Sequence, residues 1–148
     1  MSKKILYIDM DNVLVDFRSS FKFLDTDIKT KFHGNLDNVP NIFSKMTPLE
    51  GAIESYIRLS DKYDTYILST APWDNPTAWS DKLKWVKHYI GEKAKKRLIL
   101  SHNKHLNLGE YLIDDRPKNG ASEFKGEWLH FGEDGVYKTW EDIVDYLL

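Results

Sequence analysis

The chain has no cysteine, and that absence excludes both a disulfide framework and thiolate chemistry. It also lacks a strong excess of charge. The formal net charge of its 148 residues is −2, so no overall basic field exists to hold a nucleic-acid polymer. Long apolar runs are missing as well, and the run near the start, Ile5 to Ile8, is too short for a signal sequence or a membrane span. We therefore expect a cytoplasmic protein whose partners include no membrane and no nucleic-acid polymer.

The composition that remains is typical of one folded domain. Hydrophobic residues make up 41% of the chain and charged residues 30%, as in soluble globular proteins. A chain of about 150 residues can bury roughly two-thirds of the surface that its unfolded state exposes. We expect a single domain over residues 1–148, as a monomer or a homodimer.

The order of apolar patterns predicts an α/β fold with a parallel sheet, arranged in three layers. The first strand is expected within the stretch 3–16, whose apolar run is 5–8, and further strands at 64–70, 97–101, 110–113 and 127–131. Helices are expected at 16–31, 49–63, 74–90 and 139–148. Residues 32–48 contain Gly34 and two prolines and are expected to be irregular. Together with the helix before them they form an insertion, a small cap at about 16–48, after the first strand.

Two of the expected helices show a clear apolar face. In the helix at 74–90 that face is formed by Trp79, Leu83, Val86 and Ile90. In the closing helix it is formed by Trp140, Ile143, Val144 and Leu147. These faces are expected to pack on the sheet, because apolar residues at helical spacing mark the buried side of a helix.

The first strand ends in two carboxylates, Asp9 and Asp11. In extended chain, residues i and i+2 point to the same side and lie roughly 6.5–7 Å apart. That gap can hold a cation and a phosphoryl group between two oxygen ligands. The alternative for this pair alone is turn chemistry, since Asp is common where strands end.

Polar residues also end two further strands, Ser69 and Thr70 after one and Asp114 and Asp115 after the other. Ligands of parallel sheets bind at the carboxyl ends of the strands. Three strand ends of this kind therefore indicate one shared site. The hydroxyl groups of Ser69 and Thr70 can donate to a phosphoryl group, or can cap the strand end instead.

Four carboxylates at one edge would repel each other and raise one another's pKa. A hard divalent cation relieves this repulsion, and an all-oxygen set with few protein ligands favours Mg²⁺. Lys104, in the loop after the third strand, can hold a carboxylate ionised and bind a phosphate oxygen. The alternatives are a simple turn at Asp114–Asp115 and a solvated surface position for Lys104.

The segment Asp9-Met10-Asp11-Asn12-Val13 resembles the first motif, D-x-D-x-[TV], of the haloacid dehalogenase-like (HAD) phosphatases. Ser69 stands where the second motif has its hydroxyl residue, Lys104 where the third has its lysine, and Asp114–Asp115 where the fourth has its acidic pair. Each motif is weak alone, but all four occur in the expected order across nearly the whole chain. More narrowly, Ile113-Asp114-Asp115-Arg116-Pro117 resembles the 5'(3')-deoxyribonucleotidase branch.

This resemblance implies a Rossmann-like core and Mg²⁺-dependent phosphomonoester hydrolysis through an aspartyl-phosphate. Asp9 would attack phosphorus, and Asp11 would protonate the leaving oxygen and then activate water. Mg²⁺ would be held by the Asp9 carboxylate, the Asp11 main-chain carbonyl and Asp114, with Asp115 behind these ligands. Lys104 and Ser69 would bind the phosphoryl oxygens.

The branch implies deoxynucleoside monophosphates as substrates, but its members usually carry a larger cap that selects the base. Here the short insertion and the loop after the second strand supply Phe17, Phe43 and Trp73 as a substrate pocket. An aromatic ring can stack on a base, which is worth roughly 1–3 kcal/mol. The alternative for these rings is packing of the cap onto the core.

Three alternatives remain at this level. The same site can act on a sugar phosphate or another small phosphomonoester. A non-catalytic metal- or phosphate-binding module would lack a nucleophile or an acid/base, and neither is missing. A phosphatase of nucleic-acid ends is disfavoured by the negative net charge, because the local cluster Lys93, Lys95, Lys96 and Arg97 is typical of a solvated helix end.

Overall fold

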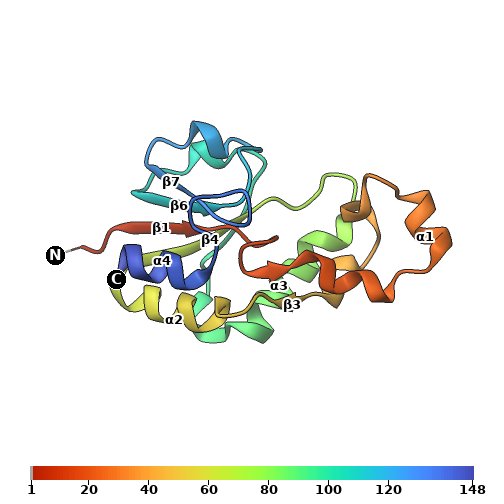
Figure 1. The fold of residues 1–148 in the computed structure, drawn as a ribbon, viewed down its shortest axis with the longest axis horizontal. Coiled ribbons are helices and arrows are strands. Elements are labelled where there is room, and N and C mark those ends of the chain that lie inside the picture. Colours follow the sequence, from red (N-terminus) through yellow and green to blue (C-terminus); the bar gives the residue numbers. More distant parts are fainter. Residues whose placement is uncertain (1) are drawn as a thin grey trace.

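The computed structural model describes residues 2–148, and its centre is a five-stranded sheet (Figure 1). Neighbouring strands pair in parallel in the order β5-β4-β1-β6-β7. The strands are β1 (Ile5–Ile8), β4 (Asp64–Ser69), β5 (Leu98–Leu100), β6 (Tyr111–Asp114) and β7 (Glu127–His130). The predicted α/β fold with a parallel sheet is confirmed, and each expected strand forms.

Different segments cover the two faces of the sheet. Leu6 and Ile8 pack with the main core, which includes α2 (Ala52–Lys62), α3 (Pro76–Tyr89) and α4 (Trp140–Leu147). The other face, which carries Tyr7, is covered by the 3₁₀ turns η5 (Lys104–Leu106) and η6 (Ala121–Glu123) and the residues around them. Figure 1 shows α2 and α4 on one side of the sheet and these turns on the other. Among residues 2–148, no helix has the length and apolar character that a membrane crossing requires.

The predicted apolar face of the closing helix is confirmed. Trp140, Ile143, Val144 and Leu147 are the residues that α4 buries. The helix begins with a capping box, in which the Thr139 side chain and the Asp142 side chain bond each other's main-chain N–H groups.

The predicted apolar face of α3 is wrong in part. Trp79 and Leu83 keep 39% and 43% of their surface exposed. The helix instead buries Ala78, Asp81, Lys82, Trp85 and Val86. The reason is that α3 packs against the cap as well as the sheet, so its buried side is turned toward the space between them.

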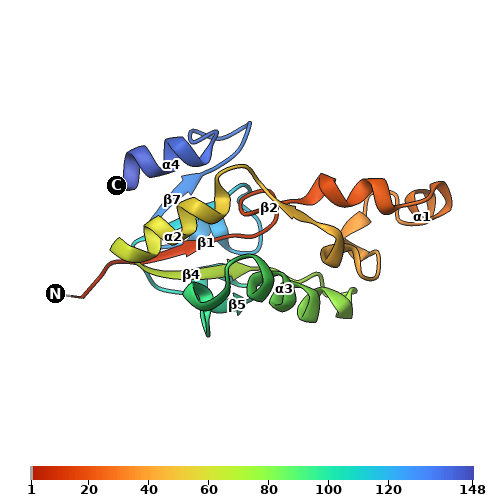
Figure 2. The ribbon, with the colours of Figure 1, turned by 90° about the horizontal axis from the view of Figure 1, so that it is seen from below.

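The insertion projects beyond the carboxyl edge of the sheet, at the right of both Figure 1 and Figure 2. A two-stranded antiparallel ribbon closes its base, and 3₁₀ turns and one short helix lie between. These elements are β2 (Val15–Asp16), η1 (Phe17–Phe23), α1 (Thr26–Lys31), η2 (Leu36–Asn38), η3 (Ile42–Lys45) and β3 (Thr47–Pro48).

The single helix predicted for 16–31 is wrong. The backbone is extended at Leu24 and Asp25, and a new helix starts behind them. The Asp25 side chain accepts the N–H of Ile28 at 2.8 Å. An aspartate that caps a helix end in this way competes with continuation of the preceding helix.

Hydrogen bonds fasten the cap to α3 and the loop before it. The Asn75 side-chain amide donates to the carbonyls of Asp37 and Val39 at 2.8 and 3.0 Å. The Trp85 indole donates to the carbonyl of Met46 at 3.1 Å. The position of the cap is therefore set by the same helix that packs beside β5.

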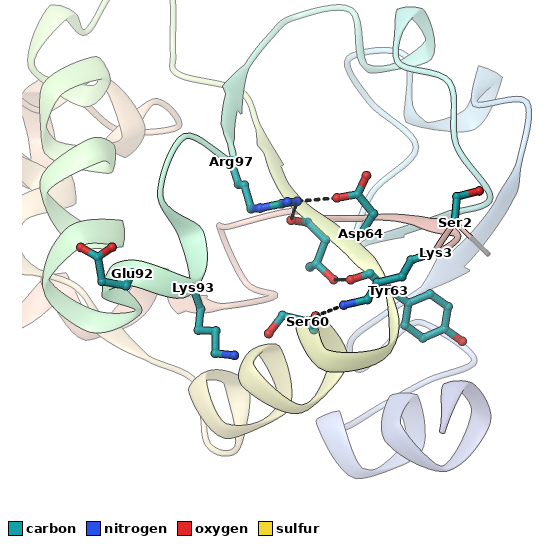
Figure 3. A pocket seen from close by; sticks show the side chains of 9 residues that line it. Ser2, Lys3, Ser60, Tyr63, Asp64, Glu92, Lys93 and Arg97 are labelled. Atoms are coloured by element: carbon teal, nitrogen blue, oxygen red, sulfur yellow. Dashed lines mark hydrogen bonds and ion pairs between the residues drawn. The ribbon is translucent and has the colours of Figure 1, made fainter.

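The amino ends of the strands form the opposite edge of the sheet (Figure 3). There Arg97 donates to the Asp64 carboxylate at 2.5 Å and to the Thr65 carbonyl at 3.1 Å, and Lys3 donates to the carbonyl of Ser60 at 3.3 Å. Arg97 and Asp64 are each about one-third exposed, so this ion pair contributes little to stability. It joins the starts of β4 and β5 and lies away from the predicted site.

Candidate active site

The carboxyl ends of β1 and β6 bring two of the predicted carboxylates side by side. Ile8 pairs with Ile113, so the next residues along the two strands, Asp9 and Asp114, come level. The N–H of Asp9 donates to the carbonyl of Ile113 at 2.9 Å. Both side chains are buried, with 6% and 2% of their surface exposed. Main-chain pairing therefore fixes the spacing of the two carboxylates.

A tight turn follows Asp9 and positions Asp11. The N–H groups of Val13, Leu14 and Val15 converge on the carbonyl of Met10 at 3.0, 2.8 and 2.9 Å. Asn12 adopts a left-handed φ of 60°, which Asn tolerates better than most residues. After the turn Val15 runs parallel to Asp11, and the buried Val13 and Leu14 anchor the turn in the core.

Lys104 lies between the two level carboxylates. Its ammonium donates to Asp9 Oδ1 at 3.0 Å and to Asp114 Oδ2 at 2.6 Å. All three side chains are nearly inaccessible to solvent. Lys104 is thus a buried counter-ion at the site, not a solvated surface residue.

Burial and charge move the pKa values of these groups apart. Burial raises the pKa of Asp9, but the charges of Lys104 and Lys82 outweigh it and the pKa lies below its ordinary value. Burial and the charge of Asp9 raise the pKa of Asp114 to about 8 and that of Asp115 to about 6. Burial would lower the pKa of Lys104, yet the two carboxylates raise it. Asp9 is therefore the carboxylate that stays ionised, as a nucleophile must.

Three carboxylates form a cluster that suits a hard cation. Asp9, Asp114 and Asp115 each offer one oxygen, and these oxygens lie within 4.8 Å of one another. Such an all-oxygen set fits Mg²⁺. Asp115 was expected to lie outside the set of metal ligands, but it offers an oxygen to the same cluster. The Asp11 carboxylate is not part of this cluster and bonds a different side chain. Ligation by the Asp11 carbonyl stays a prediction.

The partner of the Asp11 carboxylate is Lys82, which the apolar spacing of the helix did not predict. Lys82 of α3 is fully buried and donates to Asp11 Oδ2 at 3.0 Å and to Ser69 Oγ at 2.8 Å. The sequence does contain an indication of it, because one face of the same helix at helical spacing is apolar except for a single lysine. That face consists of Ala78, Lys82, Trp85 and Val86. A lysine inside an apolar stripe indicates a buried partner of opposite charge.

The two hydroxyl residues at the end of β4 differ in what they can donate. Ser69 Oγ accepts from Lys82, so its own proton remains available. Thr70 Oγ1 donates to the carbonyl of Ser101 at 2.7 Å. Thr70 lines the narrow cavity beside Asp9, together with Lys104, Arg116 and Lys118. The same cavity is also lined by the carboxylates of Asp9, Asp11 and Asp114, so positive and negative side chains face each other across it.

The three aromatic residues proposed for the substrate pocket lie in different surroundings. Phe17 and Phe43 pack edge to face, with ring centroids 5.9 Å apart, and Phe43 keeps only 2% of its surface exposed. Trp73 is 80% exposed and lies 6.0 Å, centroid to centroid, from the ring of His102. Trp73 is the ring with a free face, while Phe43 serves the core of the cap.

Known proteins resemble this chain in sequence over most of its length. The model of the family described as "5' nucleotidase, deoxy (Pyrimidine), cytosolic type C protein" matches residues 22–136. A Vibrio phage KVP40 protein, provisionally named a 5'(3')-deoxyribonucleotidase, is 55% identical over 98% of this chain and 85% of its own. The human 5'(3')-deoxyribonucleotidase of cytosolic type is 25% identical over 83% of this chain and 76% of its own.

Solved structures with little sequence identity share the fold. YfnB of Bacillus subtilis, a protein assigned as a HAD hydrolase and crystallised with magnesium, superposes with a TM-score of 0.68 at 11% identity, over 99% of both chains. A HAD-superfamily hydrolase of Geobacter sulfurreducens superposes with a TM-score of 0.59 at 12% identity, over 99% of this chain and 97% of its own. The fold is therefore the Rossmann-like fold of HAD hydrolases.

Proposed function

The chain belongs to the 5' nucleotidase, deoxy (pyrimidine), cytosolic type C family of phosphoric monoester hydrolases, and we propose that it removes phosphate from deoxynucleoside monophosphates with the help of Mg²⁺. The observation that carries the proposal is the different surroundings of the two carboxylates that follow β1, Asp9 and Asp11. The Lys104 ammonium keeps the Asp9 carboxylate ionised. The Asp11 carboxylate, two residues further along the chain, pairs with the Lys82 ammonium. Family membership favours this enzyme over a non-catalytic binding module.

The first chemical step transfers the phosphoryl group to Asp9. A carboxylate oxygen of Asp9 forms a bond to phosphorus as the ester P–O bond breaks. The leaving nucleoside oxygen takes a proton from the Asp11 carboxyl group, so the nucleoside departs as a neutral alcohol. Lys104 and the Ser69 hydroxyl stabilise the charge on the phosphoryl oxygens.

The second step releases phosphate and restores the enzyme. Asp11, now a carboxylate, accepts a proton from a water molecule whose oxygen attacks phosphorus. The P–O bond to Asp9 breaks, and orthophosphate leaves. Asp11 is thereby protonated again and Asp9 is again a carboxylate, so protons and bonds balance over the cycle.

A metal ion has a clear place in this scheme. Asp9, Asp114 and Asp115, with the Asp11 carbonyl, would hold Mg²⁺, which when bound neutralises charge on the phosphoryl group. The proposal for Mg²⁺ is supported by the hard, all-oxygen donor set of this chain.

The pH dependence of Mg²⁺ affinity tests the cluster. A carboxyl group must be ionised to bind a metal, and the pKa values of Asp115 and Asp114 are raised to about 6 and about 8. We therefore expect apparent Mg²⁺ affinity, measured by calorimetry, to rise as pH increases from 6 to 8, and hydrolysis to stop in excess EDTA. Asp134→Asn, which removes an exposed carboxylate elsewhere, should leave the profile unchanged. A pH-independent affinity, or full activity in EDTA, contradicts the metal site.

The substrate proposal rests on the branch of the family and on Trp73. We propose that residues 16–48 act as a small cap of a single domain and that the exposed Trp73 ring stacks on the base. Phe17 and Phe43 pack against each other in the cap, so among these three residues Trp73, in the loop after β4, is the one that can supply the base contact.

Comparing substrates tests this proposal. Deoxynucleoside monophosphates should be hydrolysed with higher kcat/KM than ribose or glucose phosphates. Trp73→Ala should raise KM for nucleotides about 5- to 100-fold, the equivalent of a lost base stack, and leave KM for a base-free ester unchanged. Trp79→Ala is the matched control, because the Trp79 ring also lies near His102, 6.3 Å from it centroid to centroid. Equal or better efficiency on sugar phosphates would favour the alternative substrate class, and equal effects of Trp73→Ala on both esters would remove Trp73 from the pocket.

A further inference from the structure

Lys82 carries a charge in a place where lysine is rarely found. None of its surface is exposed, although lysine normally keeps its ammonium group in water. Removing an ammonium from water costs several kcal/mol unless partners compensate it. The partners of Lys82 should therefore explain why the charge is there.

Those partners come from three separate parts of the fold. The ammonium donates to Asp11 Oδ2 at 3.0 Å, in the loop after β1, and to Ser69 Oγ at 2.8 Å, at the end of β4. It also lies 4.5 Å from the ring centroid of Phe43, in the cap. Lys82 has no exposed surface and the Asp11 side chain keeps 23% of its own, so water screens the bond between them only in part.

The second oxygen of Asp11 is left without a partner. Asp11 Oδ1 is buried and makes no hydrogen bond to any group of residues 2–148. Asp11 lines the narrow cavity beside Asp9, and so does Lys104, but Lys82 does not. Lys104 is therefore placed to meet a phosphoryl group directly, whereas Lys82 reaches the cavity only through Asp11.

We propose that Lys82 is a positioning residue that holds the Asp11 carboxylate by Oδ2 and leaves Oδ1 as the oxygen that transfers the proton. The inference rests on the proposed function, in which Asp11 is the acid and base. In the first step the Oδ1–H bond breaks and its proton goes to the leaving oxygen. In the second step Oδ1 takes a proton from the attacking water. Fixed orientation matters because a displacement of about 1 Å at a reacting group can cost roughly 10²-fold in rate.

The test separates the two steps. With p-nitrophenyl phosphate the leaving group needs almost no acid, so phosphorylation of Asp9 survives a misplaced Asp11 while water attack does not. Lys82→Met should then release a burst of about one nitrophenolate per enzyme, followed by turnover about 10²-fold below wild type. Mass spectrometry should find the phosphoryl group on Asp9. Asp11→Asn should give the same pattern.

A double variant tests whether Lys82 acts through Asp11. If it does, the combination of Lys82→Met and Asp11→Asn turns over no more slowly than Asp11→Asn alone, because the second change removes nothing further. Lys84→Met, an exposed lysine of the same helix, should behave as wild type. If Lys82→Met does not fold, as judged by circular dichroism, Lys82→Gln takes its place; its amide can still donate to Asp11, so the same burst and a smaller loss of turnover are expected.

Three results would overturn the proposal. They are wild-type turnover in the Lys82 variant, slow turnover without a burst, and a double variant that loses a further factor of about 10². The last two would indicate that Lys82 binds the phosphoryl group directly. A failure of the proposed function is distinguishable, because Asp11→Asn itself would then form no phosphorylated Asp9.

Discussion

Asp9→Asn should abolish turnover and leave the first-strand peptide free of phosphate. The change removes the attacking oxygen and a metal ligand while keeping the shape of the side chain. Loss of a covalent nucleophile lowers kcat by the order of 10⁶-fold in a well-studied protease, so activity should fall below detection. Incubation with p-nitrophenyl phosphate, followed by mass spectrometry of the whole protein and its peptides, measures the outcome.

Asp11→Asn is the matched control for this result. It keeps the main-chain carbonyl at position 11 and loses only proton transfer, which is typically worth 10²–10⁴-fold. This variant should still carry a phosphoryl group on Asp9 and turn over slowly. A phosphorylated first-strand peptide from Asp9→Asn, or wild-type turnover in Asp11→Asn, would show that the two roles are assigned to the wrong residues.

Lys104→Met should produce the largest loss of stability. It leaves Asp9 and Asp114 buried without their shared ammonium, and breaking a buried ion pair by removing one partner costs about 3–5 kcal/mol. The loss should grow as pH rises. The charge of Lys104 lowers the pKa of both Asp9 and Asp114, so both pKa values are higher in the variant, and a carboxyl group with a raised folded-state pKa loses its contribution to stability as pH rises through that pKa.

Urea unfolding of the metal-free protein at pH 6, 7 and 8 measures this effect. Lys118→Met is the control, because Lys118 lines the same cavity but is exposed, and an exposed substitution is expected to change stability by no more than about 0.5 kcal/mol. Saturating Mg²⁺ should restore part of the loss in Lys104→Met, since a bound cation again supplies positive charge to the carboxylates. Equal stability of the two variants would contradict the role of Lys104 as a buried counter-ion.

Much of the molecule followed from the chain alone. A short apolar run that ends in Asp-x-Asp, and further runs that end in Ser-Thr and Asp-Asp, predicted a parallel sheet with one polar edge, because carboxyl ends of parallel strands meet. The order of the four motifs also indicated the family, which the comparisons confirm. The residues at a strand end are a local feature, and the order of the motifs depends only on their positions along the chain. Each can therefore be read from the sequence without the structure.

The tertiary structure decided the rest. Which side of α3 is buried depends on the cap and the sheet together, so periodicity favoured Trp79 and Leu83 while the fold buries Lys82. The same packing directs the Asp11 carboxylate toward Lys82, and the path of β6 brings Asp115 into the acidic cluster. The partner of a buried side chain comes from a segment distant in sequence. The spacing of apolar residues within one helix does not indicate which distant segment will pack against that helix.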